Sequence, residues 1–303
     1  MISRHSDDQN FSHNPMKVLI AGGSGFIGSH LLPALVGAGH ETYNIIRSVD
    51  SHLPAGVIPI VGDLRQMETI SIPKVDVVVH LAQSNIRFPD GAEDLLMINS
   101  VSAVRMALAA AALGAQKFIY CSTGNVYGAN SGPVSESAPL LGGSFYAESK
   151  IAAERLLGEL KQRIGLDILR VYSPYGPGQQ PFRLIPDVVR RVLENRAVSI
   201  RANGMPVLSP LYVDDAVAGI MARVSAEDFA VMNLAGDEVV TIEDIARQAG
   251  RIIGREPIFE MLNDAMTGGT AAINERFRMM LGRACIPLAR GLETYISWLQ
   301  GRA

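Results

Sequence analysis

Short apolar runs alternate with longer amphipathic segments along the first 171 residues of the chain. The runs are nearly continuous in Val, Ile and Leu, which is typical of strands buried on both faces of a parallel sheet. They are KVLIA from Lys17, TYNII from Thr42, VIPIV from Val57, VDVVVHL from Val75, KFIYCS from Lys117 and LDILRV from Leu166. Segments of helical spacing, such as SVSAVRMALAAAALG and ESKIAAERLLGELKQRIG, lie between them. This repetition predicts an α/β fold with a doubly wound parallel sheet.

The alternation weakens after Val171, where the Pro- and Gly-rich passage SPYGPGQQPF begins. Helical patterning returns later, at DDAVAGIMARV, TIEDIARQAGRIIG and LARGLETYISWLQ. We therefore expect the sheet domain to cover residues 16–172, with a return segment near 207–236. A smaller, discontinuous C-terminal lobe is expected from residues 173–206 and 237–303, and the polar residues 1–15 predict a disordered tail.

The composition argues against several classes of protein. Lys plus Arg number 27 and Asp plus Glu number 30, so the net charge of −3 gives no general reason to bind nucleic acid or an anionic membrane. The Ala-rich segment is interrupted by Arg105, so we expect no membrane span and a soluble protein. Cys121 and Cys285 lie far apart, which suits the cytoplasm. The six histidines all fall at or before His80 without ligand spacing, so no metal site is predicted.

A glycine-rich motif, Gly22-Gly23-Ser24-Gly25-Phe26-Ile27-Gly28, follows the first predicted strand and opens the first helix. Gly22, Gly25 and Gly28 allow a tight turn and a close backbone approach to a pyrophosphate at the helix N-terminus. This pattern predicts a Rossmann dinucleotide-binding domain. About 20 residues later a ribose-binding carboxylate is expected, but Arg47 stands there instead. Arg47 favours NADP over NAD as the NAD(P) cofactor; the alternative is a solvated loop arginine.

A second motif places Tyr146 and Lys150 four residues apart, so that both lie on one face of a helix. The preceding strand ends in Cys121-Ser122-Thr123, which places a hydroxyl group at the strand end. A lysine ammonium near a phenol lowers the pKa of the phenol, which makes a general acid/base. The Tyr–Lys pair and such a hydroxyl together predict a general acid/base site; the alternative is an ordinary helix face that carries a Tyr and a Lys.

The chain resembles the extended short-chain dehydrogenase/reductases, in particular the NAD(P)-dependent nucleotide-sugar epimerase/dehydratase family. The resemblance rests on AGGSGFIGSHL, VGDLR, VVHLAQ, IYCSTGNVYG, YAESK, LRVYSPYGPGQ and YVDDAV, which occur in the family's order over residues 17 to about 235. It implies a catalytic set of Thr123, Tyr146, Lys150 and Asn99. The residues implied at the cofactor are Gly22, Gly25, Phe26, Ile27, Gly28, Arg47, Asp63, Leu64, Leu81, Ala82, Gln83, Tyr146, Lys150 and Tyr172. Thr123, Ser173 and Arg183 are expected at the substrate.

Two departures from the family pattern narrow the function. The resemblance implies that dehydratases of this family carry a Thr-Asp-Glu motif after the fifth strand, which supplies an acid for the elimination of water. This chain has Thr123-Gly124-Asn125 there, which argues against sugar dehydration. Members of the family often bind the substrate diphosphate through an Asn and an Arg. At those two positions this chain has Ser173 and Leu208. We expect an NAD(P)-dependent nucleotide-sugar epimerase that acts as a homodimer. The alternatives are an NADP(H)-dependent keto-sugar reductase and, less favoured because the catalytic residues are intact, a non-catalytic NADP(H)-sensing regulator.

Overall fold

The computed structural model describes residues 15–48, 53–84, 86, 88–130, 132–263 and 268–301. The predicted disordered tail, residues 1–15, lies outside the described residues except for Pro15. In the described part, seven parallel strands form the central sheet in the order β3-β2-β1-β4-β5-β6-β10. These strands are β1 (Lys17–Ala21), β2 (Glu41–Ile46), β3 (Val57–Val61), β4 (Val77–His80), β5 (Lys117–Thr123), β6 (Gly165–Val171) and β10 (Val231–Leu234). The predicted doubly wound Rossmann sheet is confirmed.

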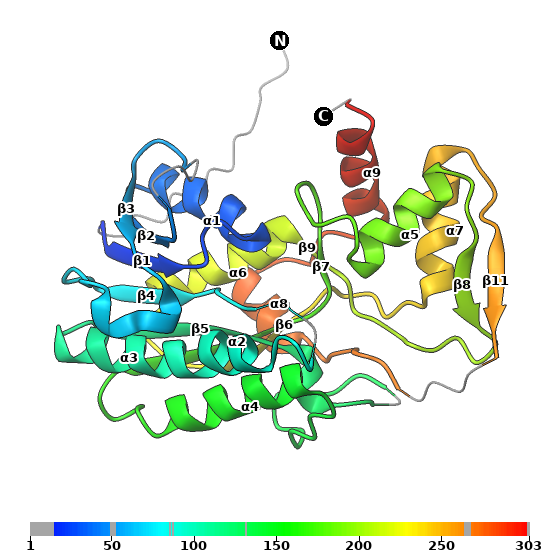
Figure 1. The fold of residues 1–303 in the computed structure, drawn as a ribbon. Helices are drawn as coiled ribbons and strands as arrows, with labels where there is room; N and C mark the ends of the chain where they lie inside the picture. The colour runs from blue at the N-terminus through cyan, green and yellow to red at the C-terminus, as the bar shows by residue number, and fades with distance from the viewer. Residues whose placement is uncertain are drawn as a thin grey trace, which may run out of the picture.

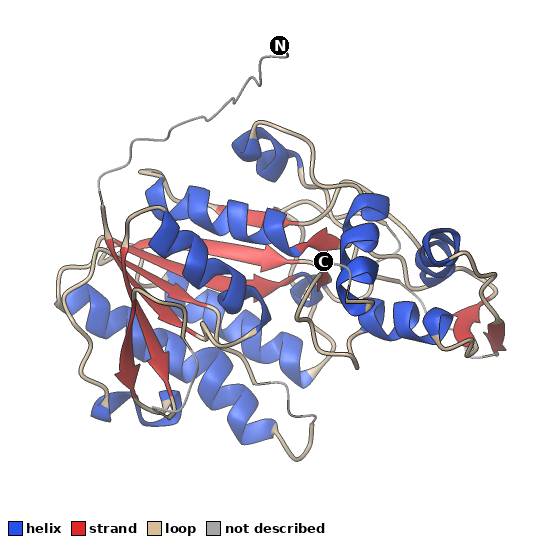
Figure 2. Ribbon diagram, turned by 90° about the horizontal axis from the view of Figure 1, so that it is seen from above, coloured by secondary structure: helices blue, strands red, loops and turns tan. Residues whose placement is uncertain are grey.

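Helices cover both faces of the sheet (Figures 1 and 2). One face packs on α1 (Phe26–Gly37) and α6 (Val213–Ser225), and the other packs on α3 (Ser102–Ala112) and α4 (Phe145–Gly158). Successive side chains of a strand point to opposite faces. Val18 and Ile20 of β1 accordingly join the α1 side of the core, while Leu19 joins the α3 side. This is why the strands read as continuous apolar runs.

Strand β3 departs from the prediction that every run is buried on both faces. It is the last strand of the sheet, paired only with β2, and Ile58 and Val61 are 41% and 55% exposed. Its position also explains Pro59, because an edge strand tolerates a residue without a backbone N–H.

Two further short elements follow the carboxyl ends of the strands. The 3-10 turns η1 (Leu64–Thr69) and η3 (Gly124–Tyr127) come after β3 and β5. Between β4 and α3 run α2 (Ala92–Leu96) and a π-helical turn, η2 (Met97–Val101).

The helical stretch 92–112 is long and apolar enough to cross a membrane by length and composition alone, which was not expected from the sequence. Its buried residues, including Ala103, Met106, Ala107 and Ala110, pack on the sheet, which accounts for their apolar character.

A smaller group of elements lies beyond the carboxyl ends of the strands, on the right in Figure 1. It contains α5 (Leu184–Leu193), β8 (Val198–Arg201), α7 (Ile242–Ile253), β11 (Phe259–Leu262) and α9 (Leu288–Leu299). Strands β8 and β11 pair with each other, and β7 (Pro174–Tyr175) pairs with β9 (Leu211–Tyr212). Helix α8 (Glu275–Leu281) instead contacts α6 and β10 of the sheet domain.

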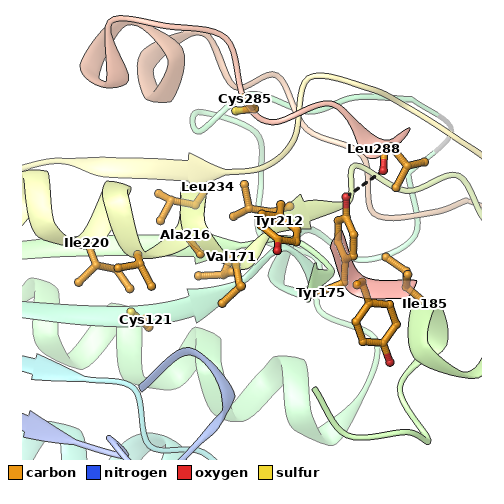
Figure 3. Packing of buried hydrophobic residues seen from close by; sticks show 14 of the residues in the cluster. Cys121, Val171, Tyr175, Ile185, Tyr212, Ala216, Ile220, Leu234, Cys285 and Leu288 are labelled. Carbon is orange, nitrogen blue, oxygen red and sulfur yellow. Dashed lines mark hydrogen bonds between the residues drawn. The ribbon is translucent and has the colours of Figure 1, made fainter. Parts of the chain in front are cut away.

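One hydrophobic cluster continues from the sheet into this group of elements. Figure 3 shows Cys121 and Leu234 of the sheet in the same cluster as Ile185 of α5 and Leu288 of α9. The Tyr175 hydroxyl lies 3.4 Å from the Leu288 carbonyl oxygen, to which it donates. Because the core is shared, the smaller elements are held beside the carboxyl ends of the strands.

Candidate active site

A cleft of about 1130 Å³ opens at the carboxyl ends of β1, β4, β5 and β6 and extends to the N-terminus of α5. In doubly wound sheets this is where ligands bind, because the strand order reverses between β1 and β4. The structure brings together here most of the residues singled out in the sequence. Those that line the cleft are Gly22, Gly25, Phe26, Ile27, Gly28, Arg47, Asp63, Leu64, Leu81, Ala82, Gln83, Thr123, Tyr146, Tyr172, Ser173 and Arg183. Lys150 and Asn99 lie behind its wall.

The glycine-rich loop packs directly on the segment that follows β4. Gly22 has φ +92°, and a Cβ there would lie 2.5 Å from the Ala82 nitrogen and 2.7 Å from its Cα. A Cβ at Gly28 would lie 2.4 Å from the Gly23 Cα. No side chain caps the first turn of α1, whose N-cap residue is Gly25. The loop therefore fits a dinucleotide pyrophosphate, with backbone N–H groups available to an anion.

Two arginines lie at the end of the cleft beside β2 and β3. Asp63 accepts from the Arg65 backbone N–H at 2.9 Å and from Arg65 Nε at 3.0 and 3.1 Å. These hydrogen bonds hold the pKa of Asp63 below its ordinary value, and the charge of Arg47 contributes. Arg65 also lies 3.6 Å from Asp94. Arg65 was not among the residues predicted from the sequence, although the Asp-x-Arg spacing after the third strand could have indicated it.

Tyr146 enters the cleft from the first turn of α4. The helix is capped by Ser144, whose hydroxyl accepts from the Ala147 N–H at 3.1 Å. The Tyr146 hydroxyl donates to Gln83 Oε1 at 3.0 Å. Burial raises the pKa of Tyr146, while a hydrogen bond from Thr123 and the positive charge of Arg183 act in the opposite direction.

Lys150 lies one turn after Tyr146 on α4, and its ammonium group is directed toward β5. Its side chain is 1% exposed, and Nζ donates to the Cys121 carbonyl at 2.9 Å and lies 4.7 Å from the Tyr120 ring centroid. Burial lowers the pKa of Lys150 to about 8. The Lys150 ammonium is thus directed toward β5 in this structure. The effect of Lys150 on the pKa of Tyr146 that the sequence led us to expect stays a prediction.

Asn99 connects the cleft wall to α4 from within the π-helical turn. Its Oδ1 accepts from the Ser84 N–H at 3.0 Å, and its Nδ2 donates to Ser149 Oγ at 3.0 Å. Its backbone carbonyl accepts from the Tyr120 hydroxyl at 2.6 Å. Asn99 is completely buried, so it holds neighbouring segments together and does not line the cleft.

A buried ion pair that the sequence analysis missed ties α4 to the sheet. Arg170 of β6 donates to Glu154 of α4 through Nη2 at 2.6 Å and Nε at 3.2 Å, and both side chains are buried. Ser122 donates to the same carboxylate, next to Thr123. Arg170 Nη1 also donates to the Tyr127 hydroxyl at 2.6 Å. Glu154 lies four residues after Lys150, so the face that carries Tyr146 and Lys150 is fixed by this pair.

The far end of the cleft carries mixed chemistry. Arg183 is the N-cap residue of α5, and Ser173 has φ +35° in the turn before β7. Leu208 also lines this end and forms a backbone bridge with Thr270. The cleft thus has a cation and hydroxyl groups near Tyr146. At position 208, where the family often has an arginine, it has the apolar side chain of Leu208.

A Rossmann sheet with a glycine-rich loop, Thr123, Tyr146 and Lys150 at its carboxyl edge defines an enzyme of the extended short-chain dehydrogenase/reductase type. The chain belongs to the NAD dependent epimerase/dehydratase family, whose model matches residues 18–235.

Two curated relatives are enzymes of nucleotide-sugar metabolism. The chain is 27% identical over 273 residues to YtcB, an uncharacterized UDP-glucose epimerase of Bacillus subtilis, covering 80% of this chain and 83% of YtcB. It is 28% identical over 251 residues to the dTDP-glucose 4,6-dehydratase of Streptomyces antibioticus, covering 76% of this chain and 75% of that enzyme.

Two solved structures resemble the whole fold. MoeE5 in complex with UDP-glucuronic acid and NAD superposes with a TM-score of 0.83 at 26% identity, covering 95% of this chain and all of MoeE5. The UDP-glucuronic acid 4-epimerase of Bacillus cereus, also in complex with UDP-glucuronic acid and NAD, gives a TM-score of 0.83 at 25% identity with the same coverage. Both similar structures therefore hold NAD and a UDP-sugar.

Proposed function

We propose that this enzyme is an NAD(P)-dependent nucleotide-sugar epimerase with Tyr146 as its acid/base residue. One observation carries the proposal: Thr123 and Tyr146 line the same continuous cleft as the glycine-rich loop, so a sugar hydroxyl and a dinucleotide can meet there. The relatives that act on or bind nucleotide sugars support this substrate class.

In this proposal Tyr146 takes the proton from the reacting sugar hydroxyl and later returns one. Thr123 holds the same hydroxyl by a hydrogen bond, and Asn99 and Lys150 keep the surrounding segments in place. The nicotinamide supplies hydride acceptance and donation when it is bound. The residues that would hold the cofactor are Gly22, Gly25, Phe26, Ile27, Gly28, Arg47, Asp63, Leu64, Leu81, Ala82, Gln83 and Tyr172.

Arg183 is the residue we propose for the anionic part of the substrate. It is the N-cap residue of α5 and lines the cleft, so a positively charged residue stands next to a helix N-terminus, which itself favours anions. Ser173 lines the same cleft. Leu208 supplies no charge there, so Arg183 would replace the cation expected at that position.

The test of the epimerase proposal follows product stereochemistry and cofactor absorbance together. The purified enzyme is mixed with a panel of UDP- and dTDP-sugars and with their keto forms. Interconversion of epimers without consumption of added NAD(P)H is the expected result. Stoichiometric oxidation of NAD(P)H with a keto-sugar would instead establish the keto-sugar reductase. Cofactor binding without any turnover would favour the NADP(H)-sensing regulator.

We also propose that NADP is preferred to NAD, on the strength of Arg47. A charge-assisted contact between Arg47 and a 2′-phosphate contributes about 1.5 to 3 kcal/mol, or one to two orders of magnitude in affinity. Arg47→Ala should remove most of this preference, as measured by calorimetric titration with both cofactors. Arg105→Ala is the control, since Arg105 pairs with Glu68 away from the cleft. Equal affinities for NAD and NADP in the unaltered enzyme would refute the preference.

A homodimer is the final part of this proposal, formed through the helices that contain Asn99 and Tyr146. Leu108 of α3 and Leu156 of α4 are 38% and 52% exposed on these helices, which gives an apolar surface for a second copy. Light scattering coupled to size-exclusion chromatography should report twice the chain mass, and a monomer at micromolar concentration would contradict it.

A further inference from the structure

Gln83 makes a hydrogen bond that the family resemblance does not assign. Its Oε1 accepts from the Tyr146 hydroxyl at 3.0 Å, across 63 positions of sequence. Both backbones are firmly placed. The segment of Gln83 is packed against Gly22 through Ala82, and Tyr146 lies in a helix that is capped by Ser144 and tied to the cleft wall through Asn99. The hydrogen bond therefore links the segment after β4 to helix α4. It does so at the Tyr146 hydroxyl oxygen, which carries the proton in the proposed function.

The two protonation states of Tyr146 need opposite partners. A phenol donates its hydrogen, whereas a phenolate can only accept. The amide of glutamine offers both, a carbonyl oxygen that accepts and an NH₂ group that donates, and half a turn of the amide exchanges them.

We propose that Gln83 is a positioning residue that holds the Tyr146 oxygen in both protonation states, accepting from the phenol and donating to the phenolate. This inference rests on the proposed role of Tyr146. Hydrogen bonds to charged groups are stronger than those between neutral groups, so a partner that follows the ionisation stabilises the phenolate more than the phenol. Gln83 then lowers the pKa of Tyr146, which burial alone raises.

Other groups that face Tyr146 come from several elements. Thr123 at the end of β5 donates a hydrogen bond, and the charge of Arg183 reaches it from the start of α5. Tyr120 of β5 is electrostatically coupled to it, but its hydroxyl donates to the Asn99 carbonyl. Lys150 on the same helix is bonded to the Cys121 carbonyl. Substitutions at Gln83 leave these groups in place, so a change in the pKa of Tyr146 reports on Gln83.

The experiment titrates Tyr146 directly by the ultraviolet absorbance of tyrosinate. Subtracting the titration of Tyr146→Phe isolates the signal of Tyr146 from the other tyrosines, and circular dichroism checks the fold. Gln83→Met keeps the length of the side chain but removes both hydrogen-bonding groups. We expect this variant to raise the pKa of Tyr146 by about half a unit to one unit. Gln83→Glu, which can only accept and adds a negative charge, should raise it by about one unit or more.

The direction of the shift in Gln83→Met decides the inference. If Gln83 only accepts from the phenol, its loss destabilises the neutral form and the pKa of Tyr146 falls. A fall, or no change, would overturn the proposal. Gln180→Met is the matched control, because Gln180 lines the same cleft and should leave the pKa unchanged. The titration needs no substrate. The expected shifts in a protein without epimerase activity would therefore count against the proposed function alone, and epimerase activity without the shifts would count against Gln83 alone.

Discussion

Tyr146→Phe should lower kcat by about 100- to 10,000-fold while the fold and cofactor binding are preserved. The substitution removes only the hydroxyl that would carry the proton, and general acid/base catalysis contributes a factor of this size. The ring remains, so the start of α4 should keep its packing. The measurement is steady-state kinetics on a nucleotide sugar that the unaltered enzyme converts, together with a cofactor titration and a thermal melt.

Tyr43→Phe provides the matched control. Tyr43 lies on β2 outside the cleft, and its hydroxyl donates to Glu41. Tyr43→Phe therefore also removes a tyrosine hydroxyl, but at a position outside the cleft. Its kcat should stay close to that of the unaltered enzyme. A Tyr146→Phe enzyme that keeps more than about a third of its kcat would move the proton transfer to another group.

Arg170→Met should reduce the free energy of unfolding by about 3 to 5 kcal/mol. The substitution leaves the Glu154 carboxylate buried with Ser122 but without its cation, and breaking one side of a buried ion pair has a cost of this size. It also removes the donor to the Tyr127 hydroxyl. Urea denaturation followed by circular dichroism measures the change, provided that the transition is two-state.

The double variant Glu154→Leu with Arg170→Met separates the unpaired charge from the lost packing. Since apolar residues of similar volume can replace a buried pair at little cost, the double variant should be more stable than Arg170→Met alone. Arg247→Met is the surface control. Arg247 pairs with the exposed Glu243, and its loss should change the free energy of unfolding by less than about 1 kcal/mol. If Arg170→Met were no less stable than Arg247→Met, the Arg170–Glu154 pair would not hold α4 in place.

The sequence predicts well those features that depend on local pattern. Continuous apolar runs identify the strands, and glycine spacing identifies the loop whose Gly22 has no room for a side chain beside Ala82. Strand order is not visible in such patterns, so the edge position of β3 and the exposure of Val61 had to come from the structure.

Contacts between residues distant in sequence are the part that pattern does not predict. Arg170 is one of two charged residues, with Asp167, in an otherwise apolar strand, and nothing local points to Glu154 as its partner. The Gln83–Tyr146 hydrogen bond likewise depends on how β4 and α4 are placed. For Lys150 the spacing predicted the correct helix face, but the direction of a long side chain was decided by the Cys121 carbonyl and the Tyr120 ring.

In the proposed reaction a sugar carbon is inverted by loss and return of a hydride, and Tyr146 moves only the hydroxyl proton. Running the epimerisation in deuterium oxide and examining the product by NMR tests it most directly. A hydrogen that leaves and returns as hydride does not exchange with water, so we expect the inverted carbon to carry no deuterium. Deuterium appearing at that carbon in step with inversion would mean that the carbon itself is deprotonated, and hydride transfer would then not be the mechanism of inversion.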